Sequence, residues 1–351
     1  MVRVEEKKIN EFATAAFRAI GVPEEDAKMA AKLIINTEKR GVVTHGLAKL
    51  SSFYVYPTKN QAMNAKADVK VLAETASTAS LDGDKGLGFV VGSKAMKLAV
   101  EKAKQTGVGI VNVRNIGHFG SAMNYPLLAV EDGMIGFCMT DTPPWMAAPG
   151  TGNRTVGTNP FSFAAPAGEK DSFVIDMSTT VVAAAKLNTP DHKIPAGWLI
   201  DKKGNSITDT SGIDMAQAAL LPTGSDPIHG AYKGYGLGIM VEILTSILTG
   251  SHCAMLKGQD SGRGAGYYSL FGAINIEVFT SKAAFNAMMD EMIDAFENLP
   301  DKLPGVDKLY VPGGRSAEKL RDCEQNGIPL SEEVIEDHRA LGKDLGIAID
   351  Y

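Results

Sequence analysis

Two of the six histidines in the sequence stand where an imidazole suits catalysis. His45 in "VTHGLAKL" and His118 in "NIGHFGSAMNY" each lie at the end of a regular element with a glycine beside them, so that backbone can approach a ligand there. An imidazole titrates near neutral pH, which makes histidine the usual general acid or base. Each residue alone is equally compatible with a hydrogen-bonded structural histidine. The other four are His192, His229, His252 and His338.

Neither the histidines nor the cysteines are spaced for a metal site. The histidines form no HxH or HExxH pattern, and the three cysteines, Cys138, Cys253 and Cys323, form no CxxC pair. Widely separated cysteines fit a reducing compartment and argue against a disulfide framework. We therefore expect no bound metal ion and a cytoplasmic protein.

A glycine-rich segment raises the question of a dinucleotide site. Gly86, Gly88 and Gly92 in "GDKGLGFVVG" are spaced as GxGxxxG between a predicted strand and a predicted helix. No acidic residue stands about 20 positions further on, at the end of a following strand, to hold a ribose. Short glycine pairs are also common in a chain with 37 glycines. The segment therefore favours an ordinary strand-to-helix turn.

The hydrophobic pattern outlines an α/β framework around these residues. Two amphipathic helices are predicted within residues 1–40, and from about residue 69 short β-rich runs alternate with helices. The strands predicted at 155–166 and 172–178 are separated by a short polar turn typical of a hairpin, which favours a mixed sheet. Further strands are predicted at 70–75, 78–83, 108–113, 134–140 and 272–279, and helices at 89–107, 121–133, 232–250 (buried) and 281–299, the last capped by Thr280 or Ser281.

The overall composition is that of a globular protein that acts on small molecules. The 351 residues are 44% hydrophobic and 22% charged, with a formal net charge of -6. An acidic balance argues against nucleic-acid binding, which needs clustered Lys and Arg. The first eight positions carry charges rather than an apolar signal segment. The longest apolar stretch, 235–250, contains Glu242 and is too short to span a bilayer, so we expect no membrane partner.

Several motifs that occur in one order form the most specific signal. They include "THGLAKL", "RNIGHFGSAMNY", "VGTNPFSFAAP", "FVIDMSTT" and "YKGYGLGIMVEILTSILTG". Over about residues 5–330 the chain resembles the malate/lactate dehydrogenase type 2 family, whose relatives include ureidoglycolate, sulfolactate and diketogulonate dehydrogenases. The resemblance implies an NAD(P)-dependent oxidoreductase and a homodimer. It also implies an α/β, non-Rossmann mixed-sheet fold flanked by helical segments from both termini. Such a fold does not need the glycine motif with which Rossmann folds bind dinucleotides.

The resemblance also implies roles for individual residues. His45 matches the histidine of the family's SHG motif and His118 that of its HFG motif, so both are proton-transfer candidates. Asp176 is suited either to orient an imidazole or to meet cofactor hydroxyls. The cofactor would be NAD or NADP, and the residues that match the family's cofactor-binding segments are Thr142, Asp176, Met177, Ser178, Lys233, Gly313, Gly314 and Arg315.

Two residues are predicted to contact the substrate. Lys49 stands where the family usually has arginine, and lysine pairs with a carboxylate as a point charge rather than as a planar fork. We predict that Lys49 anchors the substrate carboxylate, and the alternative is a solvated surface lysine. Asn159 in "GTNP" is either a second substrate contact or a turn-forming residue before Pro160.

The predicted reaction interconverts a small 2-hydroxy acid and its 2-oxo acid, with malate or lactate as the leading substrate. A hydride leaves C2 for the nicotinamide while a base removes the hydroxyl proton. The alternatives are ureidoglycolate, sulfolactate or a cyclic imine acid as substrate, or a catalytically silent ligand-binding relative. The predicted domains are a helical one from residues 1–68 plus 281–351, and a mixed-sheet body at 69–280 for cofactor binding and dimerisation.

Overall fold

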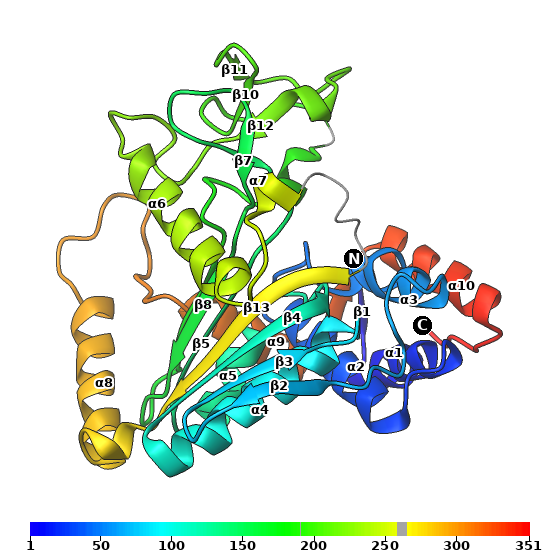
Figure 1. The fold of residues 1–351 in the computed structure, drawn as a ribbon, viewed down its shortest axis with the longest axis vertical. Coiled ribbons are helices and arrows are strands. Elements are labelled where there is room, and N and C mark those ends of the chain that lie inside the picture. Colours follow the sequence, from blue (N-terminus) through cyan, green and yellow to red (C-terminus); the bar gives the residue numbers. More distant parts are fainter. Residues whose placement is uncertain (190, 258–264) are drawn as a thin grey trace.

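A seven-stranded mixed sheet forms the centre of the molecule (Figure 1). The computed structural model describes residues 1–189, 191–257 and 265–351. β3 and β4 pair in parallel and the other neighbouring strands pair antiparallel, so the predicted mixed sheet is confirmed. In spatial order the strands are β2 (Lys70–Glu74), β3 (Thr78–Asp82), β4 (Val108–Gly117), β13 (Ala265–Ile274), β5 (Ile135–Thr140), β8 (Phe161–Ala165) and β9 (Phe173–Met177).

Helices cover both faces of this sheet. α4 (Gly88–Thr106) packs against β4 and β13, and α5 (Asn124–Glu131) packs against β5. α6 (Ala231–Glu242) continues into the π-helical segment η5 (Ile243–Ile247), which packs against β13 and β4. Because successive side chains of a strand point to opposite faces, Phe271 joins the core under α4 and α5 while Leu270 joins a cluster with α6.

A second, five-stranded sheet lies in the upper lobe of Figure 1. Its strands have two or three residues each, and an apolar cluster that includes Ile194, Leu199 and Leu220 packs beside them. The sequence does not predict this sheet, because such short strands show no alternation. In spatial order the strands are β11 (Ser206–Ile207), β10 (Leu199–Asp201), β12 (Ala218–Leu220), β6 (Met146–Ala147) and β7 (Arg154–Val156).

Helices from both chain ends lie side by side next to the central sheet (Figure 1). α1 and α2 pack on each other, α9 packs on α2, α10 packs on α1, and β1 pairs with β14. α8 lies apart from them, beside the turn between β8 and β9, so the boundaries of a terminal helical domain stay a prediction. These elements are β1 (Val2–Val4), α1 (Glu6–Ala19), α2 (Glu24–Lys39), α8 (Lys282–Glu297), α9 (Gly314–Asn326), β14 (Ile328–Leu330) and α10 (Glu332–Leu345).

Most predicted elements are found close to their expected bounds. The two N-terminal helices, α4, α5 and the β8–β9 hairpin are confirmed, and the Ser281 hydroxyl caps α8 by accepting the Ala284 N–H at 3.2 Å. Several short helical segments were not predicted. They are η1 (Leu47–Lys49), η2 (Leu50–Val55), α3 (Tyr56–Lys59), η3 (Ala184–Leu187), η4 (Met215–Gln217), α7 (Ala254–Lys257) and η6 (Ile276–Val278).

Two strand predictions are wrong in their bounds. The strand expected at 155–166 is interrupted at Asn159, whose φ of 35° breaks the extended backbone between β7 and β8. The strand expected at 272–279 is the end of β13, which begins at Ala265 and is followed by the turn η6. Asn275 follows the last residue of β13 directly, and its side chain accepts the Glu277 N–H at 3.0 Å, which stabilises the turn.

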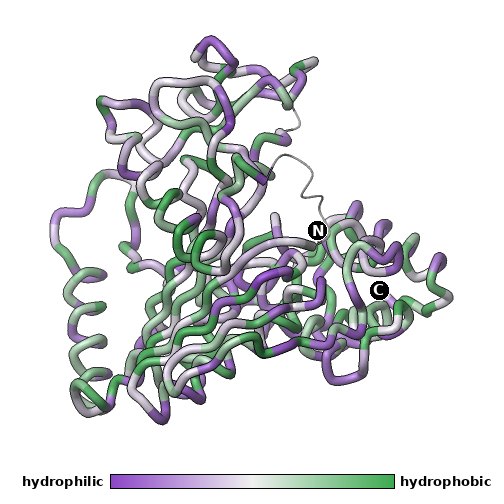
Figure 2. The backbone as a smooth tube through the Cα atoms, in the orientation of Figure 1, coloured by the Kyte–Doolittle hydropathy of each residue, from purple (hydrophilic) through white to green (hydrophobic). Residues whose placement is uncertain are grey.

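The apolar helix predicted as buried at 232–250 is half-exposed within one chain. Val241 is fully buried, whereas Ile243 is 52% exposed and Leu248 is 56% exposed. Figure 2 shows hydrophobic residues along the central strands and along α6 and η5. An apolar helix is expected to be covered by other protein atoms. Its sequence does not specify whether these atoms belong to the same chain or to another one. Among the described residues, no helix has the length and apolar character needed to cross a membrane.

Candidate active site

His118 follows directly on β4, where α4 begins close to the backbone. A Cβ on Gly88, the first residue of α4, would lie 2.4 Å from the carbonyl oxygen of His118. A Cβ on Gly92, one turn further along, would lie 2.6 Å from the ring of Tyr125. The glycine-rich segment is therefore required by the packing of α4 against the turn that carries His118. This is the ordinary strand-to-helix turn that the sequence favours.

Aromatic side chains enclose the half-buried ring of His118. Phe53 and Tyr267 meet the ring edge-on, with centroids 5.2 and 6.0 Å away. The His118 Nδ1 lies 3.1 Å from the hydroxyl of Tyr54 and accepts the Gly120 N–H at 3.4 Å. Burial lowers the pKa of His118 to about 3, because an imidazolium loses its hydration there. The ring is thus neutral at physiological pH.

His45 stacks on His118, with ring centroids 5.8 Å apart and ring planes at 10°. The His45 Nδ1 lies 2.9 Å from the hydroxyl oxygen of Thr44. Burial lowers the pKa of His45, the carboxylate of Asp176 opposes this shift, and the charge of Lys49 adds to it. The structure therefore brings together the two histidines that the sequence singles out.

Buried polar groups fix the loop that carries His45. The Glu38 carboxylate accepts the Leu47 N–H at 2.8 Å, and a Cβ on Gly46 would lie 2.0 Å from the same carboxylate oxygen. From α10, the fully buried His338 donates its Nε2–H to the Leu47 carbonyl at 3.1 Å. Burial raises the pKa of Glu38. The glycine beside His45 thus leaves room for the carboxylate that holds the loop.

Lys49 lies near the histidine pair, although the expected α-helical turn from His45 is not formed. Residues 47–49 form the 3-10 segment η1, which begins two residues after His45. The half-buried Lys49 holds its ammonium 5.3 Å from the ring centroid of Phe53 and contributes to the lowered pKa of His45. Lys49 has no ion pair within residues 1–189, 191–257 and 265–351. Its charge is therefore available to a ligand.

Asp176, near the end of β9, is hydrogen-bonded to the turn after His118. Its Oδ2 accepts the hydroxyl of Ser121 and, at 3.0 Å, the N–H of Met123. Loss of hydration next to the surrounding protein raises the pKa of Asp176. The hydrogen bonds from Ser121 and Met123 and the nearby His45 oppose this shift. The residue still stays exposed on one side in this chain. Asp176 is thus near the histidine pair while it remains open to a ligand.

The residues expected at the start of α9 pack against β9. The N–H of Val174 in β9 donates to the carbonyl of Pro312 at 3.0 Å. Gly313 has a φ of 101°, and a Cβ there would lie 2.9 Å from the N of Val174, so only glycine fits without strain. Gly314 is the first residue of α9, and the exposed Arg315 holds its guanidinium over an aromatic ring. The helix N-terminus therefore lies next to the strand that carries Asp176.

The remaining candidate cofactor residues come from β9 and α6. Met177 ends β9 and is half-buried, and the Ser178 hydroxyl that follows accepts from Thr180 at 3.0 Å. Lys233 is exposed in the first turn of α6. The hydroxyl of Thr142, which follows β5, accepts the N–H of Thr158 at 2.8 Å. The roles of these four residues in cofactor binding stay predictions.

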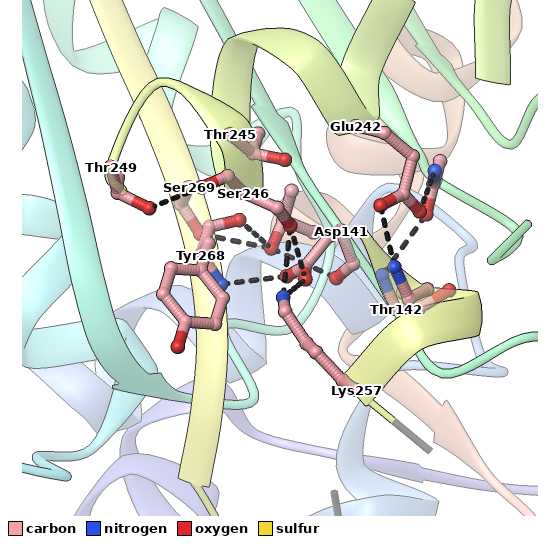
Figure 3. A network of polar contacts seen from close by, with 12 residues as sticks. Asp141, Thr142, Glu242, Thr245, Ser246, Thr249, Lys257, Tyr268 and Ser269 are labelled. Carbon is pink, nitrogen blue, oxygen red and sulfur yellow. Dashed lines mark hydrogen bonds and ion pairs between the residues drawn. The ribbon is translucent and has the colours of Figure 1, made fainter. Parts of the chain in front are cut away.

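Asn159 is fully buried, and its side-chain amide is engaged within the chain. Its Oδ1 accepts the Thr142 N–H at 3.0 Å, and its Nδ2 donates to the Gly238 carbonyl at 3.0 Å and to Glu242 at 2.8 Å. Figure 3 shows Thr142 and Glu242 at this contact between the end of β5 and α6. A structural role accounts for all three bonds, and a substrate contact by Asn159 stays a prediction.

Asp141 anchors a buried polar network that the sequence does not predict (Figure 3). Its carboxylate accepts hydrogen bonds from Lys257 Nζ at 2.6 Å, Ser246 Oγ at 2.8 Å and the Tyr268 N–H at 2.6 Å. The side chains of Lys257 and Asp141 are 14% and 5% exposed. Burial raises the pKa of Asp141, and Lys257 opposes the shift. The network joins β5, η5, α7 and β13, next to Tyr267 at the histidine site.

Sequence reasoning missed four residues near the histidine pair and also Asp141 of the buried polar network. Ser121 stands three residues after His118, so its proximity in the motif was a usable signal. The aromatic residues carry no local signal, because an aromatic side chain at helical or strand spacing is typical of a core. The five residues are Phe53, Tyr54, Ser121, Asp141 and Tyr267.

Comparison with known proteins identifies the family. The profile of the malate/L-lactate dehydrogenase family matches residues 4–338. The chain belongs to this family. It is 38% identical over 350 residues to malate dehydrogenase of Pyrococcus abyssi, a match that covers 99% of this chain and 96% of that protein. It is 35% identical over 337 residues to L-sulfolactate dehydrogenase of Methanocaldococcus jannaschii, with 95% and 94% covered.

A solved structure of a malate/L-lactate dehydrogenase relative has the same fold. The crystal structure of malate dehydrogenase from Entamoeba histolytica matches with a TM-score of 0.94 at 30% identity, covering 100% of this chain and 99% of that one. The predicted α/β mixed-sheet fold is confirmed. The predicted enzyme class, an NAD(P)-dependent oxidoreductase of small 2-hydroxy acids, is confirmed as well. The roles of the individual residues stay predictions.

Proposed function

We propose that this malate/L-lactate dehydrogenase family member interconverts malate and oxaloacetate at the stacked pair of His45 and His118. The observation that carries the proposal is this pair of neutral rings with the ammonium of Lys49 beside it, which makes no ion pair with any residue that the structure describes. A 2-hydroxy acid needs a proton-transfer group at its hydroxyl and a cation at its carboxylate, and the three side chains supply both. Malate is favoured because the relative with 38% identity is named a malate dehydrogenase.

The residues that match the family's cofactor-binding segments suit a nicotinamide dinucleotide chemically. Lys233 and Arg315 are exposed cations in the first turns of α6 and α9, where free backbone N–H groups also favour a phosphate. The Asp176 carboxylate and the Ser178 hydroxyl can accept hydrogen bonds from ribose hydroxyls or from a carboxamide. This donor set matches a ligand with an anionic centre and hydroxyl-bearing ends. We propose NAD or NADP in this region.

In the proposed reaction the chain supplies positioning and proton transfer. A bound nicotinamide supplies the hydride acceptor or donor. Lys49 holds the carboxylate of the acid, so that the C2 hydroxyl lies toward the two imidazoles. Phe53 and Tyr267 reduce the contact of the His118 ring with water, which favours the neutral imidazole. The hydroxyl proton passes to the histidine pair as the carbonyl forms.

We also propose that two copies of the chain form a homodimer. Apolar residues exposed on α6, η5 and the following turn form one candidate interface, because a monomer rarely leaves so many large apolar side chains in water. These residues are Tyr232, Met240, Ile243, Ile247 and Leu248.

A direct assay that follows the absorbance of reduced nicotinamide tests the function. Purified protein is incubated with NADH or NADPH and, separately, oxaloacetate, pyruvate, sulfopyruvate and a cyclic imine acid. We expect fastest loss of reduced nicotinamide with oxaloacetate, and the two cofactor arms decide between NAD and NADP. A higher kcat/KM for another acid would overturn malate as the substrate. No turnover with any acid would overturn the proposed chemistry of the histidine pair.

A further inference from the structure

The hydrogen bonds at Nδ1 of His118 determine which ring nitrogen carries the proton. The Gly120 backbone N–H points at this nitrogen at 3.4 Å, and a backbone N–H can only donate. Nδ1 must therefore offer its lone pair. In a neutral imidazole the proton then resides on Nε2, since one nitrogen donates and the other accepts.

Tyr54 adds a second donor to the same nitrogen. Its hydroxyl lies 3.1 Å from His118 Nδ1, and its ring is fully buried against Phe89 with centroids 4.6 Å apart. Burial raises the pKa of Tyr54 far above its ordinary value, so the phenol keeps its proton to donate. Both groups at Nδ1 therefore favour the same tautomer.

We infer that Tyr54 is a positioning residue that, with the Gly120 N–H, keeps His118 protonated on Nε2 and so makes it a hydrogen-bond donor to the C2 oxygen. The inference rests on the proposed function in placing the substrate at the histidine pair. A ring in this state cannot accept a proton at Nε2, because no lone pair is free there. Proton transfer then falls to His45.

His45 differs from His118 in the groups that face it. Its Nδ1 contacts the Thr44 hydroxyl at 2.9 Å, and a hydroxyl can either donate or accept. Asp176 on β9 favours the imidazolium and Lys49 on η1 disfavours it, while His118 stacks on the ring from β4. Both tautomers and the protonated form of His45 are therefore accessible, as a general acid and base requires.

The resulting division of roles balances the reaction. During oxidation the C2–H electron pair leaves as hydride to the oxidised nicotinamide, the O–H bond breaks, and the C=O bond forms. The hydroxyl proton moves to Nε2 of His45, and the Nε2–H of His118 stabilises the oxygen as it loses that proton. A neutral histidine that polarises a carbonyl in this way is a known enzymatic solution. The reverse steps reduce the 2-oxo acid.

Nitrogen-15 NMR of the histidine side chains tests the tautomer without any substrate. We expect the His118 signal, assigned by its loss in His118→Gln, to show a proton on Nε2 at neutral pH. In Tyr54→Phe, the Nδ1–H form should become populated and kcat should fall about 10-fold, the value of one hydrogen bond. A wild-type ring protonated on Nδ1 would overturn the inference.

Tyr125→Phe is the matched control for Tyr54→Phe. Tyr125 is also fully buried, but its hydroxyl donates to the Phe119 carbonyl at 2.5 Å and not to an imidazole. Removal of this hydroxyl should leave the His118 tautomer unchanged. A similar tautomer shift in both variants would show a general effect of lost packing and would overturn the specific role of Tyr54.

The pH dependence of oxidation separates the two histidines. In wild type, kcat/KM should fall on the acid side as His45 becomes protonated, and this limb should persist in His118→Gln but vanish in His45→Gln. His118→Gln, which keeps an N–H donor, should retain at least about 10-fold more kcat than His118→Ala. Loss of the limb in His118→Gln would overturn the division. Complete inactivity of wild type would instead overturn the proposed function, and the NMR result would still decide the tautomer.

Discussion

At the residue scale, Lys49 is expected to restrict the enzyme to substrates with a carboxylate. Its ammonium has no ion pair among the described residues and lies beside the histidine pair. Lys49→Met should raise KM for a 2-oxo acid at least about 10-fold, because a hydrogen bond to a charged group is lost. Lys49→Arg should stay within about 10-fold of wild type. Steady-state kinetics measures both values.

Lys59→Met is the matched control for Lys49→Met. Lys59 pairs with Asp344 at 2.6 Å on the protein surface, and this ion pair includes neither histidine. Its replacement should leave KM unchanged. An unchanged KM in Lys49→Met would instead mark Lys49 as a solvated surface residue.

The lowered pKa of His118 should make stability depend on pH. Its pKa of about 3 in the folded protein lies below the value of 6.5 for a free histidine, so the unfolded chain binds more protons between these values. The contribution of His118 to the unfolding free energy is therefore full above about pH 6.5 and falls as the pH drops, by at most about 1.4 kcal/mol per pH unit.

Urea unfolding of wild type and His118→Gln at about pH 8 and about pH 5.5 measures this effect. The stability advantage of wild type over the variant should shrink at the lower pH. A difference that is the same at both pH values would mean that His118 titrates like a free histidine, and would contradict its low pKa.

Local motifs predicted His45, His118 and Asp176, and the structure groups the three residues. The supporting contacts were not predictable in the same way. Tyr54 reaches His118 from 64 residues away, and His338 reaches the His45 loop across 291 residues from Leu47. A single sequence holds no local trace of such pairings, since they depend on tertiary packing.

At the element scale, the network around Asp141 joins η5 and α7 to the sheet strands β5 and β13. Asp141→Ala leaves the ammonium of Lys257 buried without its partner, and we expect a loss of about 3–5 kcal/mol of unfolding free energy. The double variant Asp141→Ala with Lys257→Met should recover part of this loss, because no buried charge is left unpaired. Denaturant unfolding of the three variants measures the coupling.

The exposed ion pair between Lys193 and Asp209 is the matched control for this network. Its side chains are 63% and 44% exposed, so Asp209→Ala should change the unfolding free energy little. An equally small loss in Asp141→Ala would contradict the proposed fastening of β5 to η5, α7 and β13.

Long periodic elements were predictable, and short ones were not. α4 and α8 have 19 and 16 residues, enough turns for an amphipathic pattern to show. The five-stranded sheet is built from strands of two or three residues, and its order places β12 beside β6, more than 70 positions earlier in the chain. Pairing between such distant short strands is set by the fold as a whole.

At the scale of the whole molecule, the exposed apolar face of η5 predicts a homodimer. Ile243→Asp should shift the protein from dimer to monomer in analytical ultracentrifugation, because the charge would have to be buried on association. Val71→Asp on the edge strand β2 is the control, since Val71 is similarly exposed at 54%. A monomeric wild type, or a dimer in Ile243→Asp, would contradict this interface.

A single-turnover reaction tests the central claim, that the histidine pair performs a nicotinamide-dependent reaction on a 2-oxo acid. The enzyme with bound NADH or NADPH is mixed with excess oxaloacetate in a stopped-flow spectrometer. Wild type should consume about one reduced nicotinamide per chain, and His45→Gln should do so about 100-fold more slowly with the cofactor still bound. No consumption by wild type, or an unchanged rate in His45→Gln, would contradict the claim.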